Sequence, residues 1–393
     1  MRVFHHRNEG AAGPETTAPI RDLSLRLRPA LAFFLACLVA ACAARPGPDV
    51  LTSVAALPNS KAVTVYVATN RLREFPDSNI YTDARALRLN YAQFRISIPP
   101  GHRAGEIEWP NGRSDPATSF AIVQQKVLDD KAFARTIAAA GHVRSKIGVF
   151  VHGYNTNFQE ALYRFAQMTA DAGVDGVPIL FAWPSAAEVT GYLKDRDAAT
   201  ASRDQLVELL TSLAQQPSEG KITVIGHSMG ARLTAEALRQ LRLMHRDAVL
   251  ARLRIILAAP DIDLDVFRTQ LEVIGPLSPP MTVLVSRDDV ALSLSSTLAG
   301  ARKRLGIVDV SDPRVQAAAL KANLQIVDIT QLKASDEFNH DRFVSLAADY
   351  HRITATANAG GSDLRHAGAY VFDSVGATLA SPFNLAGTAL LGK

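Results

Sequence analysis

The chain has 393 residues, 48% of them hydrophobic and 20% charged, a composition that can bury a large core and excludes a disordered protein. The formal net charge is +4. The excess is small, and no basic stripe with interleaved aromatic residues appears, so the charge pattern of a nucleic-acid-binding protein is missing.

The first recognisable element is an uncharged apolar run from Ala30 to Ala41, preceded by arginines. The run is too short to span a bilayer comfortably, but it fits the apolar part of a secretory signal, so we expect a signal peptide over residues 1–41. Its end, "VAAC", resembles a bacterial lipobox, in which a cysteine after small residues is acylated. The resemblance implies a lipid anchor on Cys42 and a membrane-anchored lipoprotein that faces the periplasm. The alternative is an ordinary signal peptide with a cysteine at its cleavage site.

The chain after the signal divides into three parts by composition. Residues 42–58, rich in Ala, Pro and Gly, are expected to form a tether, and residues 354–393 form an Ala/Gly-rich tail with no identifiable chemistry. Between them, residues 59–353 alternate apolar β-type runs with helical patterns. This alternation predicts one α/β domain, a mostly parallel eight-stranded sheet with helices on both faces and an antiparallel first pair of strands. The strands are expected at "AVTVYVAT", "AQFRISIP", "IGVFVHG", "VPILFAW", "KITVIG", "LRIILAA", "MTVLVS" and "LQIVDI".

The stretch "KITVIGHSMG" combines a buried strand, a sharp turn and the start of an amphipathic helix. This is the context that the motif G-x-S-x-G requires, in which two glycines let strand and helix approach and the serine is held at the turn. We therefore expect an α/β-hydrolase fold with Ser228 as nucleophile. The alternative is a small-residue turn after a buried strand.

Acyl transfer also needs hydrogen-bond donors for the oxyanion. The turn after "IGVFVHG" is where such donors lie in this fold, so we expect the oxyanion hole to be formed by the backbone amides of Met229 and Tyr154. His152 precedes the serine in the chain, and we interpret it as a structural histidine that bonds loop backbone.

The base and the acid should follow the serine in the order Ser, Asp or Glu, His. His340 comes after the last predicted strand, where the histidine of the triad belongs. The loop after the seventh strand offers Asp288 and Asp289, whose neighbouring side chains leave an extended strand on opposite sides, so only one can reach His340. Asp263, after the preceding strand, is a reserve acid.

Several pieces of the chain, in order, resemble a bacterial family of α/β hydrolases known as domain of unknown function 900, whose members are often described as esterases. They are "VYVATNR", "ISIPPGHRAGEIEWP", "FVHGYN", "FAWPS", "GHSMG", "LAAPDID" and "SRDDVAL". The resemblance implies an esterase-like fold and triad, and it implies that the acid is the fourth residue of "SRDDVAL", which is Asp289.

The sequence between the sixth and seventh predicted strands is too short for a large cap, so we expect a site open to water and to small ester substrates. Phe181 and Trp183 either line the acyl pocket or pack beneath the loops. No cofactor or metal is implied, because no Cys/His cluster has ligand spacing. We expect a serine hydrolase that cleaves carboxylic esters through an acyl-enzyme. The alternatives are an amidase or thioesterase with the same triad, or a noncatalytic envelope lipoprotein that uses the fold as a binding platform.

Overall fold

The computed structural model describes residues 45–143, 146–173, 176–216 and 220–347. The predicted signal peptide, Cys42 and the predicted tail lie outside the described residues. The chain divides into two compact units, Met1–Arg45 and Pro46–Lys393, and the fold below is that of the second unit.

The second unit is built on a nine-stranded sheet with the order β3-β2-β1-β5-β4-β6-β7-β8-β9. β1 pairs antiparallel with β2 and β2 with β3, whereas β1 and β5 and all later neighbours are parallel. The strands are β1 (Ala62–Arg73), β2 (Tyr81–Ser97), β3 (Ala121–Leu128), β4 (Ile147–Val151), β5 (Val177–Ala182), β6 (Ile222–His227), β7 (Leu253–Ala258), β8 (Met281–Val285) and β9 (Leu324–Asp328).

The mostly parallel sheet and the antiparallel first pair confirm the predicted fold class, but the sheet has one strand more than the eight expected. The additional strand, β3, lies at the edge of the sheet. Its sequence, "AIVQQKVL", has partly exposed polar residues at its centre, as an edge strand can. The sequence pattern therefore lacks the continuous apolar run by which the central strands were recognised.

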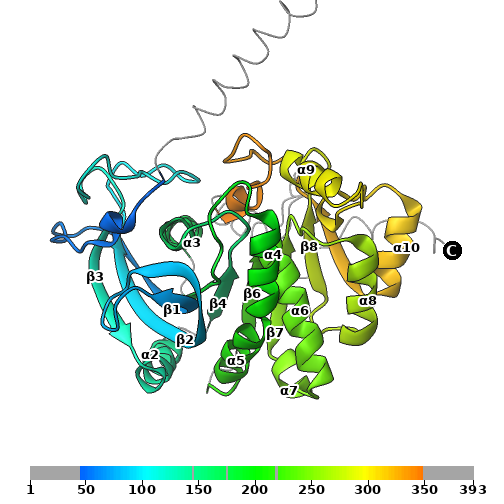
Figure 1. Ribbon diagram of the computed structural model, residues 1–393, viewed down its shortest axis with the longest axis horizontal. Coiled ribbons are helices and arrows are strands. Elements are labelled where there is room, and N and C mark those ends of the chain that lie inside the picture. Colours follow the sequence, from blue (N-terminus) through cyan, green and yellow to red (C-terminus); the bar gives the residue numbers. More distant parts are fainter. Residues whose placement is uncertain (1–44, 144–145, 174–175, 217–219, 348–393) are drawn as a thin grey trace, which may run out of the picture. The chain divides into compact units, whose positions relative to one another are not determined.

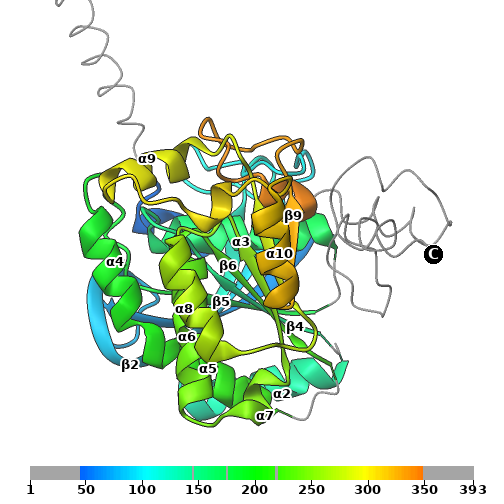
Figure 2. The same cartoon turned by 90° about the vertical axis from the view of Figure 1, so that its right-hand side faces the viewer.

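Helices cover both faces of the sheet (Figures 1 and 2). Their bounds are α2 (Asp130–Val143), α3 (Phe158–Ala172), α4 (Tyr192–Ala201), α5 (Arg203–Ala214), α6 (Met229–Leu243), α7 (Asp247–Leu250), α8 (Leu264–Ile274), α9 (Val290–Leu298) and α10 (Pro313–Lys321), with short 3₁₀ turns η1 (Pro48–Leu51) and η2 (Leu305–Ile307).

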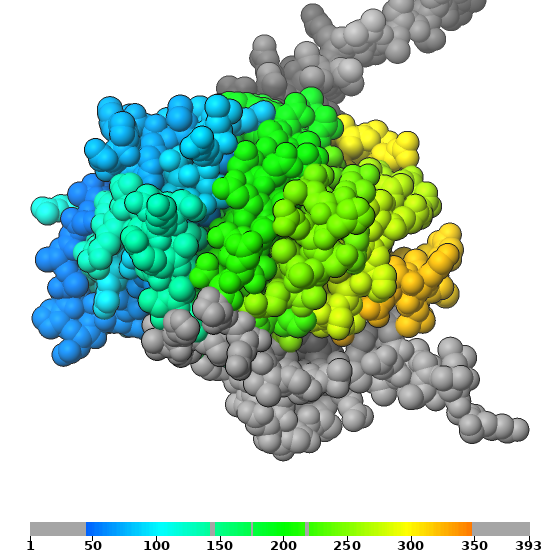
Figure 3. Space-filling view, turned by 90° about the horizontal axis from the view of Figure 1, so that it is seen from below, coloured from blue at the N-terminus to red at the C-terminus, as the bar shows by residue number. Residues whose placement is uncertain are grey.

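Alternation along the strands divides the core into two halves. In β4, Val149 packs among residues of α2, α4, α5, α6 and α8, whereas the next residue, Phe150, packs on the other face with residues of η1, α3 and the segment 343–347. Seen from below, the surface colours run from blue on one side to orange on the other, so the early and late segments of this unit lie on opposite sides of it (Figure 3).

The loops that carry the predicted site residues meet at one edge of the sheet. β4, β6, β8 and β9 are parallel, so the turns that follow them open at the same carboxyl edge. Figures 1 and 2 show α9 (yellow) and the loop after β9 (orange) side by side there. Between β7 and β8 the only helix is α8, in agreement with the prediction that no large cap intervenes.

The segment predicted to be a tether packs against the domain over part of its length. Val50 and Leu51 in η1 are buried, and the carbonyl of Val50 accepts a hydrogen bond from the Tyr163 hydroxyl at 2.7 Å. The carbonyl of Pro46 accepts one from Asn157 Nδ2 at 3.1 Å, so the start of this unit is fixed near the beginning of α3.

Candidate active site

Ser228 occupies a strained turn between β6 and α6. Its φ of 54° and ψ of −117° lie in a region that residues with a side chain rarely adopt, at a cost of about 1–3 kcal/mol. Backbone hydrogen bonds hold it there: its N–H donates to the Ala258 carbonyl at 2.9 Å, and its carbonyl accepts from Ala231 at 3.0 Å and Asp261 at 3.2 Å. The strain is thus maintained by both the following helix and the neighbouring strand.

Steric contacts explain why both positions of the motif are glycine. A Cβ on Gly230 would lie 2.3 Å from the carbonyl oxygens of both Val151 and His152, and a Cβ on Gly226 would lie 2.8 Å from the carbonyl oxygen of Gly230. These separations are far below van der Waals contact. The first turn of α6 can therefore lie against the end of β4 only because residue 230 has no side chain.

The turn after β4 lies directly against the serine, as the predicted oxyanion hole requires. A Cβ on Gly153 would come within 3.1 Å of the Ser228 Cβ, and Tyr154 is the next residue along this turn. On the other side, Met229 is the first residue of α6, where backbone amides have no partner within the helix and attract negative charge. The structure thus brings both turns together beside Ser228.

Asp289 and His340 form a close pair. His340 Nδ1 lies 2.7 Å from Asp289 Oδ2, and the Asp289 side chain is fully buried. The other carboxylate oxygen, Oδ1, accepts from the backbone N–H of Leu292 at 2.8 Å, so Asp289 is also the N-cap of α9. Because both oxygens have fixed partners, the carboxylate cannot rotate without loss of a hydrogen bond.

The electrostatics of His340 favour its protonated form. Burial lowers its pKa, but the hydrogen bond and charge of Asp289 and the nearby charges of Asp341 and Asp336 outweigh burial, so that its pKa is raised above the ordinary value. With Nδ1 held by Asp289, Nε2 is the ring nitrogen that remains for proton transfer.

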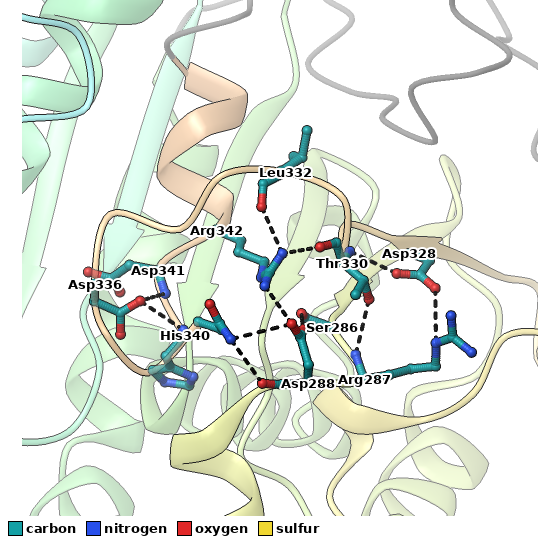
Figure 4. Close-up of polar contacts among 11 residues, drawn as sticks. Ser286, Arg287, Asp288, Asp328, Thr330, Leu332, Asp336, His340, Asp341 and Arg342 are labelled. Atoms are coloured by element: carbon teal, nitrogen blue, oxygen red, sulfur yellow. Dashed lines mark hydrogen bonds and ion pairs between the residues drawn. The ribbon is translucent and has the colours of Figure 1, made fainter.

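Asp288 holds the histidine loop (Figure 4). Its Oδ2 accepts from Arg342 at 2.6 Å and from Asn339 Nδ2 at 3.3 Å, and its Oδ1 accepts from the Ser286 hydroxyl at 2.8 Å. Asn339 and Arg342 flank His340 in the sequence. Asp288 therefore fastens the residues on both sides of the base to the loop after β8.

The reserve acid Asp263 has a different role. Its Oδ1 accepts from the backbone N–H groups of Asp265 at 2.9 Å and Val266 at 3.2 Å, so it is the N-cap of α8. Asp289 is the one of these aspartates whose carboxylate bonds His340.

His227, between Gly226 and Ser228, was not identified from the sequence. Its ring centroid lies 4.7 Å from that of His340 and 4.4 Å from that of Phe343, with which it stacks. Burial first, and then the charge of His340, place the pKa of His227 well below the usual range, so it stays neutral. The His227 ring, at the end of β6, therefore packs against the ring of the candidate base.

A buried polar group that the sequence did not reveal braces the turn after β4. Asp195, in α4, accepts from the backbone N–H of Asn155 at 3.0 Å and from the Ser185 hydroxyl at 2.6 Å. On the other side, Arg71 donates to the Thr156 carbonyl at 2.9 Å. Burial lowers the pKa of Arg71 to about 10, against the opposing effect of Asp195. The sequence offers one hint of this brace: Arg71 and Ser185 are the last residues of "VYVATNR" and "FAWPS", two of the pieces that resemble the hydrolase family.

The aromatic and histidine residues on the neighbouring strand ends are structural. His152 is buried, stacks on Trp183 at a centroid distance of 4.9 Å, and its Nε2 lies 3.1 Å from the Trp183 carbonyl. Burial lowers the pKa of His152 to about 3. Phe181 and Trp183 are both completely buried in the core, which favours packing over an acyl-pocket role.

The described ranges contain neither a candidate metal site nor a candidate membrane-spanning helix. Over those residues, no group of three or more His, Cys, Asp or Glu side chains has an arrangement that could hold a metal ion. None of the helices there has the length and apolar character needed to cross a membrane.

Comparison with known families identifies the chain. Residues 130–356 match the family described as "alpha/beta hydrolase of unknown function (DUF900)". The chain belongs to this family. The match spans the strands and loops that carry Ser228, Asp289 and His340, and it confirms the family likeness and the α/β-hydrolase fold predicted from the sequence.

Solved structures with distant similarity include several esterases. The crystal structure of ESTFA in its iron-lacking apo form has 13% identity and a TM-score of 0.31, over 79% of this chain and 83% of that one. Fungal esterases from Rhizomucor miehei give 12% identity and a TM-score of 0.29, over 91% and 93%. A lipase-esterase related protein from Clostridium acetobutylicum gives 12% and 0.22, over 57% and 95%. No curated protein matches the chain.

Proposed function

We propose that this hydrolase-family protein is a serine esterase that cleaves carboxylic esters through an acyl-enzyme. The observation that carries the proposal is the 2.7 Å contact between His340 Nδ1 and buried Asp289, in a loop whose histidine packs against the residue preceding Ser228. A buried carboxylate that orients a histidine beside a strained serine is the arrangement that serine hydrolases use.

The chemistry begins at the serine hydroxyl. Ser228 Oγ attacks the ester carbonyl carbon while His340 Nε2 accepts the hydroxyl proton, and Asp289 stabilises the resulting imidazolium. The amides of Met229 and Tyr154 receive the negative charge on the former carbonyl oxygen. The tetrahedral intermediate then collapses, with His340 returning the proton to the departing alcohol, and leaves an acyl group on Ser228.

The second half of the cycle uses water. His340 removes a proton from a water molecule, which attacks the acyl carbon and forms a second tetrahedral intermediate. Return of that proton to Ser228 Oγ releases the carboxylic acid and regenerates the enzyme. The absence of a large insertion between β7 and β8 supports access of water to this edge.

A fluorophosphonate probe tests the site directly, because it reacts covalently with an activated serine. We expect the purified protein to be labelled, peptide mass spectrometry to find the adduct on Ser228, and p-nitrophenyl esters to be hydrolysed. Parallel amide and thioester substrates distinguish the amidase and thioesterase alternatives. A folded protein with neither labelling nor turnover on any of these substrates supports the binding-platform alternative.

The proposal includes location in the bacterial cell envelope through a lipid anchor at Cys42. Its support is the sequence alone: an apolar run, "VAAC" and a cysteine immediately after Ala41. Mass spectrometry of the N-terminal peptide from bacterial membranes tests it. We expect the mature chain to begin at an acylated Cys42; an unmodified Cys42, or a mature chain that retains residues before it, contradicts the anchor.

A further inference from the structure

The turn after β7 holds both backbone groups of the strained serine. The Ser228 N–H donates at 2.9 Å to the carbonyl of Ala258, the last residue of β7, and the Ser228 carbonyl accepts at 3.2 Å from the N–H of Asp261, three residues further along this turn. A strained conformation persists only where its surroundings fix it. The conformation of the candidate nucleophile therefore depends on how firmly residues 258–261 are themselves held.

A second segment runs beside this turn and supports it. The N–H of Gly306 donates to the Pro260 carbonyl at 3.1 Å. A Cβ on Gly306 would lie 2.8 Å from the carbonyl carbon of Ala259, so the two segments are in close backbone contact. This pairing brings the side chain of Arg304 to Asp261, with which it forms an ion pair at 3.1 Å.

The Asp261 carboxylate is the centre of a buried polar cluster. Its Oδ1 accepts from the Ser295 hydroxyl at 2.7 Å and faces Arg304, and its Oδ2 accepts from the Tyr192 hydroxyl at 2.8 Å. Asp261, Ser295 and Arg304 are all buried. Burial, and then the charge of Asp261, raise the pKa of the Tyr192 hydroxyl, so it keeps the proton that it donates. Tyr192, in α4, is thereby bonded to the turn that holds the serine.

Tyr192 also contacts the turn after β4, which carries the proposed oxyanion donor. Its ring packs edge-to-face on the ring of Tyr154, with the centroids 5.5 Å apart. The Tyr154 hydroxyl donates to the carbonyls of Glu188 and Val189, so the outer end of that ring is fixed as well. An edge-to-face pair has a preferred geometry, and displacement of one ring therefore disturbs the other. Tyr192 thus joins the two turns, one through its ring and the other through its hydroxyl.

The proposed chemistry requires a fixed separation between these two turns. An oxyanion donor is effective when it lies about 2.7–3.1 Å from the developing negative oxygen, and that oxygen is bonded to the carbon that Ser228 attacks. A small shift of the Tyr154 amide relative to the serine therefore weakens stabilisation of the transition state more than binding of the substrate. The contacts of Asp195 and Arg71 hold the turn after β4 itself, whereas Tyr192 links it to the turn after β7.

We propose that Tyr192 is a positioning residue that sets the separation between Ser228 and the Tyr154 amide by joining the two turns that hold them. This inference rests on the proposed esterase function and adds a residue outside the triad and the oxyanion hole. Without the hydroxyl, the Tyr192 ring loses its bond to Asp261, and Oδ2 of a buried carboxylate loses this donor. Both turns then become freer to move relative to each other.

Tyr192→Phe tests the proposal, because it keeps the ring and removes the hydroxyl. We expect kcat for a p-nitrophenyl ester to fall by about tenfold or more, since a small misplacement of reacting groups is costly, while KM stays nearly unchanged. An alkyl boronic acid, which forms a tetrahedral adduct with an activated serine, should bind more weakly by a similar factor. The matched control is Tyr163→Phe, which removes a buried hydroxyl that donates to Val50 at 2.7 Å in the other half of the core.

A readout that does not depend on turnover separates the outcomes. Circular dichroism first shows that both variants are folded at the assay temperature. Amide hydrogen exchange of the peptide that contains residues 153–157 should then be faster in Tyr192→Phe and unchanged in Tyr163→Phe. This difference is expected because the hydroxyl of Tyr192, and not that of Tyr163, links the turn after β4 to the turn after β7.

Three results would contradict a part of this account. Unchanged kcat and boronic acid affinity in Tyr192→Phe overturn the role of Tyr192 and leave the esterase assignment standing. An equal loss in Tyr163→Phe also overturns it, because removal of any buried hydroxyl would then explain the effect. A folded, unmutated chain with neither turnover nor fluorophosphonate labelling contradicts the esterase assignment, and hydrogen exchange then still decides whether Tyr192 holds the turn after β4.

Discussion

Asp289 and His340 meet at 2.7 Å across 51 residues of sequence, and the carboxylate that orients the histidine also caps α9. The Asp289 side chain therefore both orients the candidate base and caps a helix. If the cap at Leu292 were lost, α9 would fray at the residue next to the acid, and the orientation of His340 would suffer with it. The precision of the candidate base thus depends on helix capping as well as on charge.

We predict that Asp289→Asn lowers kcat by about 10³–10⁴ while the protein remains folded. Asparagine keeps an oxygen for the Leu292 N–H and is itself a good N-cap, so stability should change little. Its amide cannot supply the charge that stabilises the His340 imidazolium. Steady-state kinetics and thermal unfolding measure the two effects separately.

Asp288→Asn is the matched comparison one residue away. It removes the charge that faces Arg342 at 2.6 Å but leaves His340 bonded to Asp289, so we expect a loss of kcat of about tenfold or less. If Asp288→Asn abolishes turnover and Asp289→Asn does not, the acid has been assigned to the wrong aspartate, although the roles of Ser228 and His340 would survive.

Ser228→Ala should reduce kcat by about 10⁴ or more and eliminate fluorophosphonate labelling. The Ser228 backbone bonds that hold the turn do not involve the side chain, so unfolding should stay cooperative. Ser212→Ala, in α5, serves as the control and should retain both label and activity. Substantial turnover by Ser228→Ala would place the chemistry at another residue.

The pH dependence of kcat/KM should reflect the ionisation of His340. The base works in its neutral form, so kcat/KM should fall as pH drops through the pKa of His340, which is raised above the ordinary value of about 6.5. Asp289→Asn removes the strongest raising influence, and the acid limb of its residual activity should move to lower pH. His227, held neutral by burial, should add no ionisation in this range. An acid limb that stays in place or moves upward in Asp289→Asn contradicts the assignment.

Gly230→Ala should destabilise the domain by about 3 kcal/mol or more, because its Cβ would meet two carbonyl oxygens at 2.3 Å and neither can move without shifting the end of β4. Gly148→Ala is the control on the same strand, since a Cβ there meets nothing within 4 Å. Chemical denaturation measures both. A Gly230→Ala protein as stable as Gly148→Ala would show that the elbow is packed less tightly than these distances indicate.

The sequence was sufficient where local pattern determines structure. Continuous apolar runs located the central strands, and G-x-S-x-G with its flanking strand and helix located the turn at Ser228. The sequence was insufficient where contacts between distant segments determine the structure. Polar β3 was missed because an edge strand needs no apolar run. The brace formed by Asp195 and Arg71 around the turn after β4 depends on contacts between distant segments, which no spacing in one sequence encodes.

The fastening of the histidine loop by Asp288 and Arg342 has a consequence for how this chain could be lengthened. Arg342 donates to the Thr330 and Leu332 carbonyls, and Asp336 accepts from the His340 N–H at 2.9 Å, so contacts on both sides of residues 333–335 fix the loop. These hydrogen bonds, and not the number of residues between them, thus set the position of the His340 imidazole. Inserted residues between Lys333 and Ser335 would bulge into solvent, which makes this segment a natural point for grafting a peptide or a reporter without displacing the base.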